Sequence, residues 1–250
     1  MWTLPIVFLI YAGCCAYLYF AQRSFIYFPV PASVNVPADD LRMDMDGATV
    51  QVWRLHALQE DAVVYFGGNA EDVSHGIPQF GRLFPDKTVY LVNYRGYGAS
   101  TGAPTEAALL SDALTVFDKV SESHSQVSVV GRSLGSGVAV YLAATRKPER
   151  LVLVTPYDSL ARLAQSSYPI FPVSAMLKDR FDSISHAGSI SAPTLVLIAE
   201  HDEIIPGWSS QNLAAAIDSS LITIDVVSDA THNTIQDFGQ YSDALGRFLL

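Results

Sequence analysis

The chain has 250 residues, half of them hydrophobic, and a formal net charge of −10 at pH 7. This length suits one large domain with a sizeable core better than two domains. The negative charge argues against a nucleic-acid partner, because phosphate binding requires clustered lysine and arginine side chains. The two cysteines, Cys14 and Cys15, are adjacent, which excludes a disulfide framework or a cysteine-based metal site elsewhere in the chain.

Residues 2–20 contain no charged side chain. As a helix this segment would span about 28 Å, close to the thickness of the hydrocarbon core of a bilayer. We therefore predict a transmembrane anchor over residues 1–22, followed at the membrane interface by Arg23 and several aromatic residues. Arg23 is the only basic residue near either end of the segment, which favours a cytoplasmic location for the rest of the chain.

Three other interpretations fit the same segment less well. A cleaved signal peptide usually has basic residues before the apolar run and small residues at its cleavage site, and neither occurs here. A lipoprotein signal ending at Cys14 is disfavoured by Tyr11 three residues earlier. A helix buried against the folded domain is the third alternative, and it would share this apolar composition.

Beyond a proline-containing linker over residues 23–40, strand-like and helix-like segments alternate along the chain. The apolar and β-branched runs that predict strands are residues 48–55, 62–66, 88–93, 126–130, 151–154, 194–199 and 221–227. The predicted helices are residues 105–120, 134–145, 208–217 and 234–250. This alternation predicts an α/β domain over residues 41–250, with a mostly parallel sheet covered by helices on both faces. Residues 157–190 interrupt the alternation and are expected to form a small cap.

A five-residue motif between a predicted strand and a predicted helix has the form G-x-S-x-G and comprises Gly131, Arg132, Ser133, Leu134 and Gly135. Because such short patterns also occur by chance, the interpretation of this motif depends on the strand before it and the helix after it. In that context the motif indicates a nucleophile elbow, in which a tight turn lifts the serine hydroxyl above the sheet. Ser133 is therefore the predicted nucleophile.

A serine nucleophile needs a base that accepts its proton and an acid that orients the base. Of the downstream histidines His186, His201 and His232, we select His232, because it follows the last predicted strand at the sheet edge where such sites lie. The predicted acid is Asp202, which follows the preceding strand. The resulting order Ser, Asp, His along the chain is typical of hydrolases with this elbow.

Other carboxylates remain alternatives for the acid. Glu200 and Glu203 follow the same strand, one on each side of Asp202, and both could equally be solvated loop charges. Asp158 follows an earlier strand, from which some hydrolases take their acid. Asp225 lies inside a predicted strand and is expected to be structural.

Acyl transfer also requires hydrogen-bond donors for the negative charge that develops on the carbonyl oxygen. One donor should be the backbone N–H of Leu134, directly after the nucleophile. The second should be the N–H of Asn69, in the loop that Gly67 and Gly68 form after an early strand. The alternative is a plain glycine turn that uses only the backbone freedom of glycine.

Several motifs together resemble one branch of the α/β-hydrolase family. They are residues 65–70 (Y-F-G-G-N-A), residues 93–106 with the core N-Y-R-G-Y-G, the elbow at residues 131–135 and the leader Q-R-S-F-I-Y-F-P at residues 22–29. The branch contains membrane-associated, single-domain serine hydrolases, often called serine-aminopeptidase-like, and includes protein depalmitoylases. The resemblance covers nearly the whole chain and implies a three-layer α/β-hydrolase sandwich with a short cap. This chain departs from the pattern of the branch at one position. Where this chain has Gly67, these proteins usually carry a histidine, which organises the oxyanion loop.

These residues imply an acyl-enzyme mechanism on carboxylic esters or thioesters, and the apolar leader favours lipid-like or acylated substrates near a membrane. No metal or organic cofactor is expected, because the chain has no H-E-x-x-H motif or carboxylate–histidine cluster. An amidase or aminopeptidase of the same fold is one alternative, and a binding module that has lost its chemistry is another. The sequence does not indicate an oligomeric state.

Overall fold

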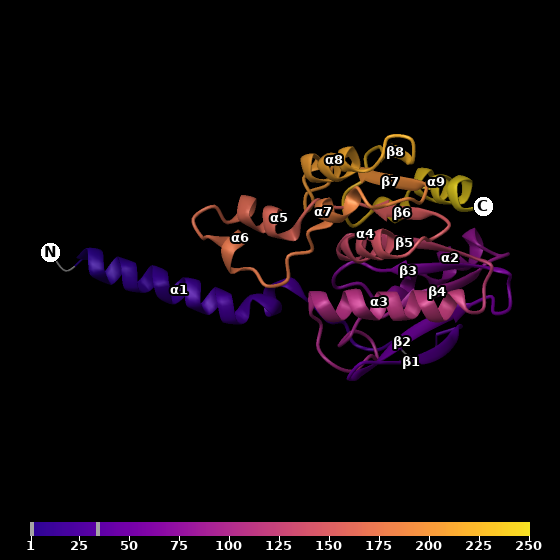
Figure 1. The fold of residues 1–250 in the computed structure, drawn as a ribbon, viewed down its shortest axis with the longest axis horizontal. Coiled ribbons are helices and arrows are strands. Elements are labelled where there is room, and N and C mark those ends of the chain that lie inside the picture. Colours follow the sequence, from indigo (N-terminus) through magenta and orange to yellow (C-terminus); the bar gives the residue numbers. More distant parts are fainter. Residues whose placement is uncertain (1–2, 34–35) are drawn as a thin grey trace.

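The computed structural model describes residues 3–33 and 36–250. The first two residues of the predicted anchor, Met1 and Trp2, and two residues of the predicted linker, Val34 and Asn35, lie outside the described residues. Figure 1 shows a long helix, α1 (Thr3–Ile26), that extends away from a domain built around one sheet.

Within the described residues, eight strands form the sheet in the order β1-β2-β4-β3-β5-β6-β7-β8. The strands are β1 (Asp39–Met45), β2 (Ala48–Leu55), β3 (Asp61–Phe66), β4 (Thr88–Val92), β5 (Gln126–Arg132), β6 (Leu151–Val154), β7 (Thr194–Ala199) and β8 (Ile222–Val227). Strand β2 pairs antiparallel with β1 and β4, and every pair from β4 to β8 is parallel. The predicted α/β domain with a mostly parallel sheet is therefore confirmed.

Helices cover both faces of this sheet and give the domain three layers. One face packs against α3 (Glu106–Ser121), α4 (Leu134–Thr145) and α8 (Gly207–Ala216). The other face packs against α2 (Ile77–Leu83), α9 (Gly239–Leu249) and the short 3-10 turns η1 (Val73–Gly76) and η2 (Ile235–Asp237). Because the central strands are covered on both sides, they consist of continuous apolar residues, as expected for buried parallel strands.

The antiparallel edge strand β1 was not predicted from the sequence. It reads D-D-L-R-M-D-M, and only alternate residues, namely Leu41, Met43 and Met45, are partly buried against the core. An edge strand exposes one side of its backbone and one face of its side chains, so it tolerates this many charges. Helix α2 was also missed, because it is short and contains Pro78 and Gly81.

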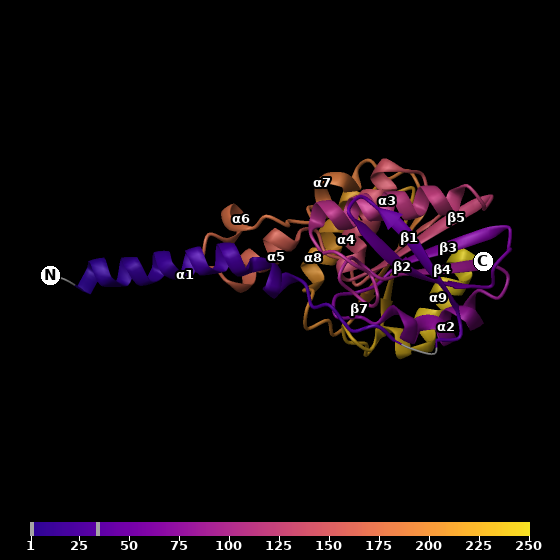
Figure 2. The same cartoon turned by 90° about the horizontal axis from the view of Figure 1, so that it is seen from below.

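The cap lies between β6 and β7 and contains three short helices, α5 (Leu160–Ser167), α6 (Val173–Met176) and α7 (Ser183–Ala187). Figures 1 and 2 both place α5 and α6 beside α1. Residues Leu4–Ile26 of α1 are long and apolar enough to cross a membrane, and none of their most apolar window is buried. This exposure argues against a helix buried in the core. The helix also continues past residue 22, where the linker was expected to begin.

Candidate active site

The elbow motif forms the sharp turn between β5 and α4. Ser133 has φ 49°, a value that few non-glycine residues adopt. A Cβ atom on Gly131 would lie 2.3 Å from the Gly135 carbonyl oxygen, and one on Gly135 would lie 2.1 Å from the Phe66 carbonyl oxygen. Both glycines are therefore required by the close approach of helix α4 to the strands, and that approach is what sets Ser133 above the end of β5.

The structure brings together the three residues predicted to carry the chemistry. Ser133 Oγ lies 2.9 Å from His232 Nε2. On the other side of the ring, His232 Nδ1 lies 2.8 Å from Asp202 Oδ2 and 3.0 Å from Oδ1. Both side chains of the His232–Asp202 pair are nearly inaccessible to solvent. An imidazole held in this way can accept the serine proton and keep the resulting charge beside a carboxylate.

The Asp202 carboxylate is itself held by the backbone. Its Oδ1 accepts hydrogen bonds from the N–H groups of Ile204 and Ile205, at 2.9 and 2.7 Å. Glu203 lies on the same loop and its carboxylate accepts from the His232 N–H at 3.2 Å. Asp202 therefore orients the imidazole ring, whereas Glu203 holds the backbone of the histidine loop.

The other candidate acids have different partners. Asp158 is fully buried, accepts from the Ser209 hydroxyl and the Ser159 N–H, and forms an ion pair with Arg162. Asp225 lies 3.5 Å from the guanidinium of Arg247. Neither carboxylate contacts His232 in the described part of the chain.

The two residues predicted to supply the oxyanion donors line the same cavity as the nucleophile. Leu134 is the first residue of α4, and the Gly67–Gly68 turn passes so close that a Cβ on Gly68 would lie 3.6 Å from the Ser133 Cβ. Among residues 3–33 and 36–250, the N–H groups of Leu134 and Asn69 donate no hydrogen bond. Two unused N–H groups beside a serine are suited to bind an oxyanion.

Sequence reasoning missed an ion pair that organises this loop. The Glu71 Oε2 atom accepts hydrogen bonds from the Gly68 N–H at 2.6 Å and from Arg132 Nη1 at 2.7 Å. Its Oε1 atom accepts from the Tyr65 hydroxyl at 2.6 Å. Burial, followed by the Glu71 charge, raises the pKa of Tyr65 well above its usual range, so its hydroxyl stays a donor. The available sequence signal was the charged residue inside the elbow, which requires a partner when it is buried.

This ion pair also explains the departure at Gly67. A Cβ atom at that position would lie 2.7 Å from Val73 Cγ1 and 3.2 Å from the Glu71 carboxyl carbon. A side chain therefore does not fit beside Glu71 in this loop. The Glu71 carboxylate, not a histidine at position 67, holds the N–H of Gly68.

An apolar cavity of about 470 Å³ opens beside Ser133. One wall comes from the end of α1, and the opposite wall comes from the cap. Leu18, Phe25 and Ile26 contribute to the first wall, and Leu160, Ala164 and Phe171 contribute to the second. The volume lies within the range of small-molecule sites, which is about 300–1,000 Å³.

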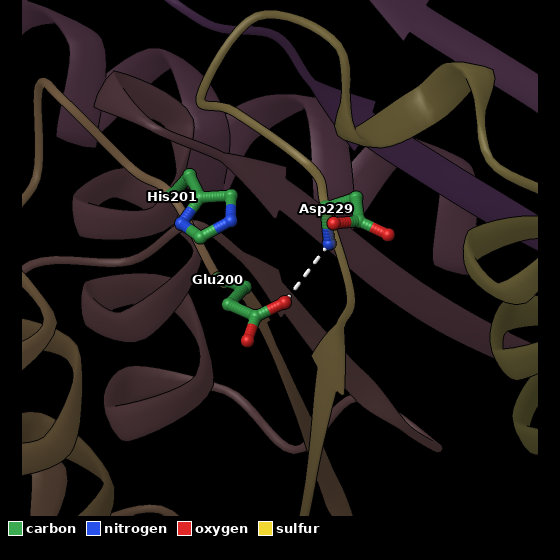
Figure 3. A group of neighbouring side chains, drawn as sticks. All are labelled: Glu200, His201 and Asp229. Carbon is green, nitrogen blue, oxygen red and sulfur yellow. Dashed lines mark hydrogen bonds between the residues drawn. The ribbon is translucent and has the colours of Figure 1, made fainter.

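One group of side chains has donor atoms suitable for a metal ion. Glu200, His201 and Asp229 place one such atom each within 4.8 Å of one another, and all three residues are exposed (Figure 3). One oxygen of Glu200 already accepts the Asp229 N–H at 3.0 Å, the dashed line in Figure 3. Exposed acidic groups of this kind are common without an ion, so we assign no metal site here.

Comparison with known proteins gives both sequence relatives and structural neighbours. No family model matches the chain. A Mycobacterium tuberculosis protein described as uncharacterised is 33% identical over 99% of this chain and 94% of its own length. The α/β hydrolase domain-containing protein WAV2 of Arabidopsis thaliana is 25% identical over 78% of this chain and 75% of its own. The lysophosphatidylserine lipase ABHD12 of Rattus norvegicus is 31% identical over 66% of this chain but only 48% of its own.

Solved structures show the same fold at low sequence identity. An esterase of Pyrococcus furiosus matches with a TM-score of 0.68 and 18% identity, over 89% of this chain and 97% of its own. The enol-lactonase of Burkholderia xenovorans matches with a TM-score of 0.66 and 18% identity, over 84% and 99%. The predicted three-layer sandwich is thus confirmed at the level of fold.

Proposed function

Since the chain belongs to the α/β-hydrolase family, we propose that it is a serine hydrolase that cleaves carboxylic esters or thioesters through an acyl-enzyme on Ser133. The observation that carries this proposal is the continuous set of contacts from Ser133 through His232 to Asp202, at 2.9 and 2.8 Å. Hydrogen-bond distances of this kind are what general-base activation of a serine requires.

In the proposed reaction, Ser133 Oγ attacks the acyl carbonyl carbon while His232 Nε2 accepts the hydroxyl proton. The N–H groups of Leu134 and Asn69 stabilise the oxyanion. His232 then returns the proton to the leaving alkoxide or thiolate, and the acyl group remains on the serine. A water molecule, deprotonated by the same His232, releases the carboxylic acid and restores the enzyme.

The environment of the site supports lipid-like or acylated substrates near a membrane. The cavity beside Ser133 has apolar walls, and one wall belongs to the helix long enough to cross a bilayer. One of the sequence relatives is a lysophosphatidylserine lipase. We propose that α1 anchors the enzyme and that the position of Arg23 favours a domain on the cytoplasmic side.

The proposal is tested by labelling the purified full chain with a fluorophosphonate, which reacts with activated serines. We expect labelling of the wild type, loss of labelling in Ser133→Ala and full labelling in the control Ser123→Ala, which changes an exposed serine outside the site. A folded wild type that is not labelled would contradict the proposal and favour a binding module. Comparing kcat/KM for matched esters, thioesters and amino-acid amides then separates the hydrolase classes, and preference for the amide would favour an aminopeptidase.

A further inference from the structure

The cap does not lie free in solvent but runs along α1. The Tyr11 hydroxyl donates to the Ile170 carbonyl oxygen at 2.8 Å, and the Tyr11 ring stacks on Phe171 at 5.7 Å between centroids. Further along the helix, Gln22 accepts from the Lys178 N–H at 2.6 Å. The contacted helix positions 11 and 22 are separated by about 16 Å at a rise of 1.5 Å per residue. The cap therefore follows α1 over roughly half of a bilayer core.

An ion pair closes this contact at the end of the helix. Arg23 Nε lies 2.9 Å from an oxygen of Asp179, whose side chain is only 5% exposed whereas that of Arg23 is 49% exposed. Lys178 places its ammonium group 4.3 Å from the centre of the Tyr19 ring. The charged groups shared by helix and cap thus gather at the domain end of α1, where a membrane interface would lie.

The cap segment beside the middle of α1, residues 168–176, has the properties of a membrane-inserted element. Its sequence, Y-P-I-F-P-V-S-A-M, contains no charged residue, and Tyr168 and Ile170 are 61% and 72% exposed. Irregular backbone is tolerated in hydrocarbon only when its polar groups are paired. Here the Gln165 side chain donates to the Phe171 carbonyl oxygen at 2.9 Å and accepts from the Ser174 N–H at 3.1 Å. The two prolines have no N–H to pair.

We infer that the cavity between α1 and the cap is an acyl-chain site, loaded sideways from the membrane leaflet that also holds residues 168–176. In this arrangement α1 determines substrate specificity as well as anchoring the enzyme, because Leu18 and Phe25 form one wall of the site. The substrate class is a long-chain acyl ester of a membrane lipid, with its carbonyl at Ser133 and its chain directed between helix and cap. The inference rests on the proposed serine hydrolase function.

The test uses the full chain in phosphatidylcholine vesicles and p-nitrophenyl esters from butanoate to hexadecanoate. Because burial of one methylene contributes about 0.8 kcal/mol, we expect kcat/KM to rise about fourfold per methylene until the cavity is filled. Leu18→Trp and Ala164→Trp fill the cavity from opposite walls. Each should lower the ratio of long-chain to short-chain kcat/KM by about tenfold or more, the equivalent of about two buried methylenes. The control Leu9→Trp, on an exposed part of α1, should leave the ratio unchanged.

Two further measurements distinguish failure of the acyl-site inference from failure of the proposed function. A diazirine-labelled fatty acid should crosslink to α1 and cap residues of Ser133→Ala protein, and Leu18→Trp in that background should abolish those crosslinks. In Ile170→Trp, brominated phosphatidylcholine should quench the fluorescence added by the new tryptophan, whereas in Ile224→Trp, on strand β8, it should not. Unchanged chain-length ratios in both wall variants, or crosslinks elsewhere, would overturn the acyl-site inference alone. Failure of Ser133 to react with a fluorophosphonate would overturn the proposed function and, with it, this inference.

Discussion

Arg132 and Glu71 form an ion pair, with 2.7 Å between Nη1 and Oε2, that joins the nucleophile elbow to the oxyanion loop. The same guanidinium donates through Nη2 to the His232 carbonyl oxygen at 3.1 Å. Burial opposes the charge on Arg132, but the groups that face it, with Glu71 foremost among them, more than offset that effect, so the pKa of Arg132 is raised. One ion pair therefore holds three loops that carry proposed catalytic groups, although neither side chain touches the reacting atoms.

The first prediction concerns Glu71→Gln. The amide removes the negative charge beside Arg132, and its NH₂ group must stand either at Oε2, where Gly68 and Arg132 donate, or at Oε1, where the Tyr65 hydroxyl donates. The oxyanion loop should therefore lose its fixed position. We expect kcat to fall about tenfold to a hundredfold with little change in KM, less than the ~10²–10³-fold cost of deleting an oxyanion donor. The control is Asp118→Asn, which breaks a similar pair with Arg146 at 2.7 Å on the exposed surface. A KM effect without a kcat effect would point to substrate binding instead.

The second prediction separates the two buried aspartates near the site. Asp202→Asn should lower kcat by a factor on the order of 10³–10⁴, because the amide no longer fixes the imidazole tautomer. Asp158→Asn should instead lower the melting temperature, because Asp158 holds Ser209 and the Ser159 N–H inside the fold. Steady-state kinetics and circular dichroism on both variants decide the assignment, and the reverse pattern would make Asp158 the acid.

The positions of the proposed triad could be predicted because apolar runs identify the strands and parallel pairing aligns their carboxyl ends. Phe66 pairs with Gly131, and Ala199 pairs with Val227, so the loops after β3, β5, β7 and β8 meet at one sheet edge. The residues that follow these strands therefore lie at the same edge of the sheet, although strand β6 separates β5 from β7. Local sequence is sufficient for that step.

The remaining features depend on contacts between side chains that are distant in the sequence. Nothing in the local pattern around Glu71 indicates that it reaches Arg132, and nothing around Tyr11 indicates that it stacks on Phe171. The cap helices are short and their positions follow from these contacts, since helices of this length have little stability of their own. The cavity beside Ser133 could therefore not be predicted from the sequence, because its walls depend on these long-range contacts.

The third prediction tests the close approach at the elbow. Gly135→Ala would place a methyl group 2.1 Å from the Phe66 carbonyl oxygen, so helix α4 must move away from β3. We expect destabilisation of about 3 kcal/mol, the upper part of the range for overpacking, and a melting temperature roughly 6–12 °C lower. Gly207→Ala is the matched control, because a Cβ there has nothing within 4 Å. Equal stability of the two variants would refute the packing argument.

The fourth prediction concerns the pH dependence of stability through Glu106, at the start of α3. Its carboxylate accepts from the N–H groups of Arg180 and Phe181, at 2.6 and 2.9 Å. Burial, together with the nearby charges of Asp179 and Asp182, raises the pKa of Glu106 above its usual value despite these hydrogen bonds. Because the folded-state pKa is the higher one, the stabilisation from this group is complete below the unfolded-state pKa of about 4.3 and is lost as pH rises through the folded-state pKa.

Glu106→Gln removes this titration but also replaces one of the two acceptor oxygens by an NH₂ group. We therefore expect the variant to be less stable than the wild type at pH 4.5, with a smaller deficit at pH 7.5. Between pH 4.5 and pH 7.5, the gap between the melting temperatures of wild type and variant should narrow by no more than about 2 °C, since solvent reaches part of the carboxyl group. Thermal unfolding of both proteins at the two pH values, in the same detergent, measures it. A deficit that grows with pH would show that the ionised carboxylate stabilises the contact between α3 and the cap.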